Sequence, residues 1–206
     1  MIENLTKFSS PLKALLPDAV HALCMKTSVK KGALLFQAGK KPVWMFFVLN
    51  GEVTLERLSQ QGDPVVLQRT RHGFVSEASL QSSKYHCDAR AVANSEIIQI
   101  PLQALADALN IDTAFAGRWI SMLNQEVKRL RLQSERLSMK SVKDRVLHLI
   151  HTEGKNGKYQ VNTGLKSLAN ELGVTHEALY RTLASLEKTY TLIRKDSFLE
   201  LTETNS

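Results

Sequence analysis

The sequence predicts an α+β protein in three parts: a strand-rich domain over residues 1–109, a long helix over 110–137 and a winged helix-turn-helix over 138–206. Short β-rich runs separated by turn residues fill the first half. The apolar pattern then changes to a heptad repeat, and two short helical patterns joined by a glycine follow. Such changes of period along one chain indicate parts with different architectures.

The composition is that of a folded, soluble protein, with 43% hydrophobic and 23% charged residues and a net charge of +7. The longest apolar run, VWMFFVL at 43–49, is far shorter than the roughly 18 residues of a membrane helix. The first residues lack a charged stretch followed by an apolar core, so export is not expected. Cys24 and Cys87 make neither a disulfide framework nor a C-x-x-C metal pair. We therefore expect a cytoplasmic protein with no metal site and no membrane partner, whose positive charge favours a polyanionic partner.

Five runs in the first half have the composition of strands, and turn residues separate them. They are ALLF, VWMFFVL, EVTLERL, PVVLQRT and EIIQI, with turn signals at Lys31-Gly32, Asn50-Gly51 and Gln61-Gly62-Asp63 and a stop at Pro101. This spacing is typical of an all-β sandwich or barrel. A short apolar helix, LLPDAVHAL at 15–23, is expected to precede the strands.

Apolar residues recur at alternating spacings of four and three through the predicted long helix. The repeat comprises Ala116, Ile120, Leu123, Val127, Leu130, Ser134 and Leu137, and it is flanked by Lys128, Arg129, Arg131, Glu135 and Arg136. A helix over 110–137 would be roughly 40 Å long, and a heptad seam with charged margins favours a homodimer. The predicted dimer interface contains Ile120, Leu123, Val127, Leu130 and Leu137, and the alternative is a single amphipathic helix packed on its own domain.

The last third predicts two short helices in a helix-turn-helix. Leu168, Ala169 and Leu172 form the apolar face of the first helix, Gly173 breaks it, and Thr175 is placed to cap the second. The second helix carries Leu179, Leu183 and Leu186, and the run TLIRKDSFLELT reads as a β-hairpin, which would be the wing.

The second helix also has the polar face that a DNA-reading helix needs. His176, Glu177, Tyr180 and Arg181 lie on the side opposite the leucines, close to Thr175 at the N-terminal end. Arg181 is suited to guanine and Glu177 to the amino group of cytosine, and the two stand one turn apart. The alternative is a surface salt bridge between them. The glycine turn, the cap and the wing together favour binding to double-stranded DNA.

From about Lys30 to Leu201 the chain resembles the Crp/Fnr family of bacterial transcription regulators. The resemblance rests on KKGALLFQAGK, FFVLNGEVTL, GFVSEASL, DRVLHLI and LANELGVTHEALYRTLASLEK. It implies a cyclic-nucleotide-binding-like β-roll (a double-stranded β-helix), a long dimerisation helix and a winged helix-turn-helix. It also implies a homodimer on a palindromic operator, base contacts by Glu177 and Arg181, a variable contact at His176, and RNA polymerase as a partner, with the loop EGKNGK where some activators touch polymerase.

The same resemblance places an effector pocket at FVSEASLQSSKYHCDARA, with Ser76, Glu77, Ala78, Tyr85 and His86 as its candidate residues. Nucleotide-binding members carry a Gly-Glu pair and then an Arg-Ser or Arg-Ala pair that holds the cyclic phosphate. Here Ser76 replaces the glycine, and Tyr85-His86 occupy the second pair. We therefore expect that the standard phosphate contacts are lost, that neither cyclic AMP nor haem is required, and that the effector is not identifiable from sequence, although Arg90 is a possible substitute cation.

An enzyme is not expected. Cys87 and His86 are neighbours in an extended segment, so their side chains point to opposite faces and cannot form a nucleophile and base pair. The alternative to a DNA-binding regulator is a cyclic-nucleotide- or haem-responsive signalling module that acts mainly through a protein partner.

Overall fold

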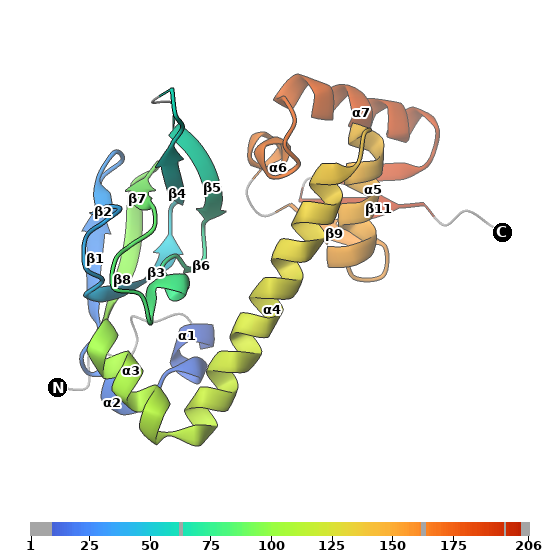
Figure 1. Ribbon diagram of the computed structural model, residues 1–206. Helices are drawn as coiled ribbons and strands as arrows, with labels where there is room; N and C mark the ends of the chain where they lie inside the picture. Colours follow the sequence, from blue (N-terminus) through green and yellow to red (C-terminus); the bar gives the residue numbers. More distant parts are fainter. Residues whose placement is uncertain (1–9, 62–63, 162–163, 196, 203–206) are drawn as a thin grey trace. The chain divides into compact units, whose positions relative to one another are not determined.

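The computed structural model describes residues 10–61, 64–161, 164–195 and 197–202 (Figure 1). The chain forms two compact units, Met1–Ser121 and Met122–Ser206. Their boundary falls within α4 (Thr113–Ser138), the longest helix of the described chain. Within the described residues, no helix is both long enough and apolar enough to cross a membrane.

The N-terminal unit begins with two short helices, α1 (Ser10–Leu15) and α2 (Asp18–His21). The single helix expected over 15–23 is wrong, because Pro17 disfavours helical backbone in the residue before it and lacks an N–H for an interior helical bond. Leu12, Leu16 and Val20 are nevertheless buried, as a packing element requires.

Two four-stranded antiparallel sheets follow, with orders β1-β8-β3-β6 and β2-β7-β4-β5. The five expected strands are confirmed as β2 (Leu34–Phe36), β3 (Trp44–Asn50), β4 (Val53–Leu58), β5 (Pro64–Thr70) and β8 (Ser95–Pro101). Three strands were not predicted: β1 (Met25–Val29), β6 (Gly73–Phe74) and β7 (Asp88–Ala91). A 3-10 turn, η2 (Glu77–Ser79), lies between β6 and β7.

The core of this unit lies between the two sheets. Both contribute to one buried cluster, which includes Phe46 and Val48 from β3, Val53 and Leu55 from β4, and Ile97 from β8. Met45 to Val48 are four consecutive buried residues of β3. Phe46 and Val48 of this strand belong to the cluster between the sheets, and Phe47, on the opposite face of the strand, contacts Phe74 and His72. Because both faces are covered, the sequence of β3 is a continuous apolar run rather than an alternating one.

Two helices end the first unit. α3 (Leu102–Ile111) stops at Asp112, whose extended backbone separates it from α4. The Asp112 carboxylate accepts a hydrogen bond from the Phe115 backbone N–H at 2.9 Å, which is N-terminal capping of α4. The long helix therefore begins at Thr113 rather than Asn110, and its first turns bury Phe115 and Trp119.

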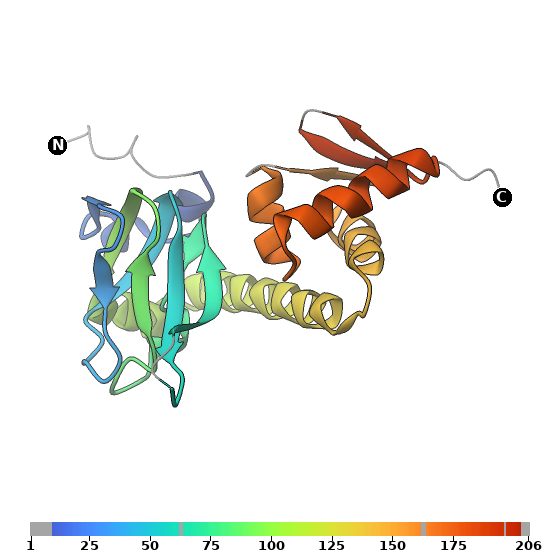
Figure 2. The ribbon, with the colours of Figure 1, turned by 90° about the horizontal axis from the view of Figure 1, so that it is seen from above.

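The second unit contains the helix-turn-helix. After the end of α4 come α5 (Val142–Glu153), β9 (Lys158–Gln160), α6 (Leu165–Glu171), α7 (His176–Lys188), β10 (Leu192–Lys195) and β11 (Phe198–Leu201). The strands form one antiparallel sheet of order β10-β11-β9. Figure 2 shows the β10–β11 hairpin beside α7, as expected of a wing. The predicted leucine faces of α6 and α7 meet Val146, Leu149 and Ile150 of α5 in one core.

Candidate nucleic-acid interface and sensor pocket

The turn between α6 and α7 has the geometry that the sequence predicts. Gly173 adopts φ +64°, a left-handed conformation that glycine accepts without strain. The Val174 N–H then donates to the Ala169 carbonyl at 3.0 Å, and the Thr175 hydroxyl accepts from the Ala178 N–H at 3.1 Å. The helix end is thus closed and α7 is capped, so its first turn is held in a defined direction.

The four polar residues predicted to read bases are all exposed on α7, while Leu179, Leu183 and Leu186 are buried. The surface salt bridge that was the alternative is not formed: within the described part of the chain, neither Glu177 nor Arg181 takes part in an ion pair. Both charged groups therefore keep their hydrogen-bonding capacity for another molecule.

Tyr180 is placed differently from the other three. Its ring lies 5.0 Å from the His176 ring in an edge-on arrangement, and the Arg194 guanidinium of β10 lies 5.1 Å above it. Arg194 also pairs with Glu187 of α7 at 3.3 Å. This stack joins the exposed face of α7 to the wing. Sequence reasoning missed Arg194, because only the antiparallel pairing of β10 with β11 brings it over α7.

A hollow of about 440 Å³ lies between α5 and α7, next to this face. Arg181, Thr182 and Ser185 line it from α7, and Lys143 lines it from the first turn of α5. Positive charge, hydroxyl groups and a helix N-terminus are groups that contact the phosphate backbone of DNA.

The heptad stripe of α4 is largely exposed. The accessible fractions are 56% for Ile120, 44% for Val127, 40% for Leu130 and 42% for Leu137, and Leu123 is half-buried. The helix buries other residues instead, Phe115 and Trp119 at one end and Arg136 at the other. Most of the stripe therefore lies outside the cores of its own units, although Leu137 is placed against Gly173, where a Cβ would come 2.8 Å from its Cδ2.

Arg136 differs from its expected place among the charged margins of that stripe. It is 1% exposed and pairs with Glu153 of α5, and its Nη1 lies 4.0 Å from the Glu171 carboxylate of α6. The cation therefore lies inside the second unit, where it joins the end of α4 to the helices that carry the helix-turn-helix.

In the first unit, the five candidate pocket residues differ in burial and in the contacts that they make. Ser76 is buried, and its hydroxyl accepts from the Phe46 N–H at 3.2 Å. Tyr85 is also buried and stacks on Phe36 at 3.9 Å, while His86 is exposed. Glu77 and Ala78 lie in η2.

Cations near this segment are already engaged. Arg90, the possible substitute for the missing arginine, pairs with Glu56 at 2.6 Å and donates to the Gly32 carbonyl at 3.1 Å. Arg57 of β4, which the sequence did not single out, donates to the His86 carbonyl at 2.8 Å. Burial raises the pKa of the neighbouring Cys87 thiol, which therefore behaves as a small apolar group.

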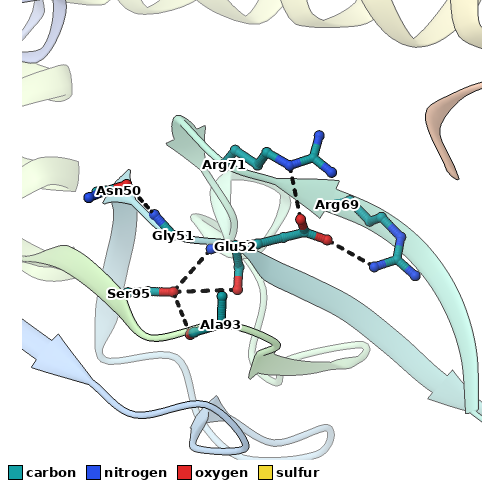
Figure 3. A network of polar contacts seen from close by, with 7 residues as sticks. All are labelled: Asn50, Gly51, Glu52, Arg69, Arg71, Ala93 and Ser95. Atoms are coloured by element: carbon teal, nitrogen blue, oxygen red, sulfur yellow. Dashed lines mark hydrogen bonds and ion pairs between the residues drawn. The ribbon is translucent and has the colours of Figure 1, made fainter. Parts of the chain in front are cut away.

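Figure 3 shows a further network at the start of β4. The Glu52 carboxylate forms salt bridges with the guanidinium groups of Arg69 and Arg71, each at 2.9 Å. Its N–H donates to the Ser95 hydroxyl at 3.1 Å, which ties the β3–β4 turn to β8. Gly51 is required there, because a Cβ would lie 2.2 Å from the Ser95 oxygen. These arginines thus serve the fold of the sheets.

The described residues contain no group of three or more histidine, cysteine or acidic side chains arranged to hold a metal ion. Residues 26–112 match the family model of the cyclic nucleotide-binding domain. The matched segment holds both sheets of the first unit. The search of curated proteins found no match to this sequence.

Solved structures extend the likeness to both units. FixK2 from Bradyrhizobium japonicum superposes with a TM-score of 0.60 at 18% identity, covering 87% of this chain and 93% of that one. The c-di-GMP-responsive global regulator CLP from Xanthomonas campestris gives 0.52 at 21% identity, with 89% and 96% covered. A CRP-family transcriptional regulator from Thermus thermophilus gives 0.52 at 15% identity, with 85% and 91% covered.

The resemblance to the Crp/Fnr family is thereby confirmed at the level of the fold. The cyclic nucleotide-binding domain is followed by a long helix and a winged helix-turn-helix in one chain, in the order that the motifs predicted.

Proposed function

We propose that the protein is a sequence-specific DNA-binding transcription regulator that acts as a homodimer on a palindromic operator. One observation carries the proposal: the capped first turns of α7 expose Glu177 and Arg181, without ion pairs in the described chain, next to a wing. A helix of this kind enters the major groove and reads bases with its N-terminal side chains.

In this proposal Arg181 donates to the O6 and N7 of a guanine, and Glu177 accepts from the amino group of a cytosine. His176 is the third reading position. Tyr180 acts with Arg194, so that its ring holds the wing against α7 while its edge faces the DNA. Lys143 contacts phosphate and therefore contributes to binding of any sequence.

The dimer forms through α4. The exposed apolar side chains of the stripe would cost free energy if they stayed in water, and pairing two such helices buries them. A dimer places two copies of α7 at half-sites related by a two-fold axis, which is why a palindromic operator is expected.

The effector pocket of the cyclic nucleotide-binding domain has lost its standard phosphate contacts. Tyr85 occupies the position that the family gives to arginine, and its hydroxyl donates to the Trp44 carbonyl at 3.0 Å rather than facing an anion. A buried phosphate without a cation is costly, so cyclic AMP is not the expected ligand. Some activators of the family contact RNA polymerase in this region, so a contact through the loop around Asn156 and Gly157 belongs to the same proposal.

The proposal is tested by anisotropy titrations of a selected operator and of random duplex DNA. Arg181→Ala should weaken operator binding by about 1–3 kcal/mol per half-site with little effect on random DNA. Lys143→Ala should weaken both alike and reduce the salt slope by about one unit. Lys30→Ala, an exposed position in the first unit that also removes one positive charge, is the control.

The reading assignment is wrong if Arg181→Ala keeps the selectivity of the parent. If the parent shows no salt-dependent duplex binding at all, the signalling module that acts through a protein partner is the better explanation.

A further inference from the structure

The first unit has a hollow that its cassette residues do not explain. It has a volume of about 410 Å³ and lies between β2, the segment before β3, and Tyr85. Phe36, Phe46 and Tyr85 are buried at its base, and Trp44 and Val43 form a wall. Small-molecule sites are hollows of roughly this size with mostly apolar linings.

The aromatic base is held in place. The Tyr85 and Phe36 rings stack at 3.9 Å with 13° between their planes, and Phe46 lies 5.7 Å from Phe36. The hydrogen bond from the Tyr85 hydroxyl to the Trp44 carbonyl fixes the far end of the ring. A flat aromatic body is complementary to such a surface, because rings gain from offset or edge-on contact beyond the area that they bury.

The mouth of the hollow is positively charged. Lys40 and Lys41 both line it, and none of its lining residues is acidic. Within the described chain, neither lysine side chain takes part in an ion pair. The loop that carries them is tied to Tyr85 by two backbone hydrogen bonds of 2.8 Å, from Gly39 to Tyr85 and from Tyr85 to Lys40.

We propose that this hollow binds an apolar aromatic anion, an aromatic carboxylate in its simplest form, whose ring lies against Phe36, Trp44 and Tyr85 and whose charge pairs with Lys40 and Lys41. The site differs from the expected effector pocket, because Tyr85 alone of the five cassette residues lines it. No arginine that could pair with a phosphate lines the hollow. The proposed ligand therefore carries a single charged group at the mouth rather than a buried phosphate. Binding of the ligand does not depend on the proposed function. Only its expected consequence, a change in DNA affinity when the ligand binds, rests on that function.

The test is a ligand-observed NMR titration of the purified full-length protein with 1-naphthaleneacetate. The neutral 1-naphthaleneacetamide, of nearly the same shape, is the control ligand. We expect saturable binding of the acid with a Kd of about 1 mM or tighter for a ligand of this size. We expect the amide to bind at least about 5-fold more weakly, since it gains no charge pairing.

Two variants locate the binding. The double variant K40A/K41A should bind acid and amide equally, whereas K30A/K31A, a lysine pair that does not line the hollow, should keep the preference of the parent. Val43→Glu places a negative charge on a wall residue that is 56% exposed, so the fold should survive and acid binding should be lost.

Equal binding of acid and amide by the parent would overturn the inference. So would an unchanged preference in K40A/K41A, or the absence of acid binding at about 10 mM, ten times the expected Kd. Operator binding without ligand binding refutes this inference alone, and ligand binding without operator binding refutes the proposed function alone.

Discussion

Replacement of Arg136 by methionine should destabilise the second unit strongly. The arginine is 1% exposed, while its partners Glu153 and Glu171 keep 26% and 30% of their side-chain surface in water. Removal of one member of a buried ion pair typically costs about 3–5 kcal/mol, because the remaining charges lose their partner. Since both carboxylates retain access to water, we expect the lower end of that range, about 3 kcal/mol.

Urea denaturation measures this loss. With a slope of roughly 1–3 kcal/mol per molar urea, a loss of about 3 kcal/mol lowers the midpoint by roughly 1–3 M. Both tryptophans, Trp44 and Trp119, lie in the first unit, so the transition seen by circular dichroism should move more than the one seen by tryptophan fluorescence. These two signals therefore separate a local effect from a general one.

Arg129→Met is the matched control on the same helix. Arg129 pairs with Glu126 one turn earlier, but its side chain is 42% exposed, so the change should cost under about 1 kcal/mol. The reasoning about Arg136 fails if the two variants lose the same stability, or if Arg136→Met loses less than about 1 kcal/mol.

Three other changes are informative. Gly173→Ala should cost at least about 1 kcal/mol in urea denaturation, because of its φ of +64° and because the new Cβ would lie 2.8 Å from Leu137 Cδ2. Gly117→Ala, in α4 with nothing within 4 Å of a new Cβ, should stabilise by about 0.5–1 kcal/mol, and equal effects would contradict this. Thr175→Ala removes the cap of α7 and should cost about 1 kcal/mol in the same assay, and no loss would show that the cap is unimportant. Burial raises the pKa of the Cys24 thiol to about 12, so at pH 8 it stays protonated and iodoacetamide should modify it slowly until urea unfolds the chain; rapid modification of the native protein, followed by mass spectrometry, would refute this.

The helix-turn-helix was predictable from sequence because its determinants are local. Gly173, Thr175 and the leucines of α7 lie within a few residues of one another, and each type of residue has one dominant use at its position. The structure confirms the turn, the cap and the buried face.

The first unit was less predictable because its contacts join residues that are distant in the sequence. Tyr85 meets Trp44 across 41 positions, and Arg57 meets His86 across 29, and both contacts depend on which strands pair. The cassette motif predicts a role for Tyr85 from its position along the chain, but the direction of its side chain is seen only in the stacking on Phe36. Arg136 was misread for a similar reason, since α5 and α6 cover a position that heptad spacing assigns to solvent.

The central claim, that α7 reads DNA, is tested most directly by a pull-down of fragmented genomic DNA with the purified protein. The parent should enrich an inverted repeat whose half-site centres lie about 10–10.5 base pairs, or a multiple of that, apart. The E177A/R181A variant should retain salt-sensitive binding without that motif. Enrichment of no inverted repeat by the parent, or of the same repeat by the variant, would contradict the account.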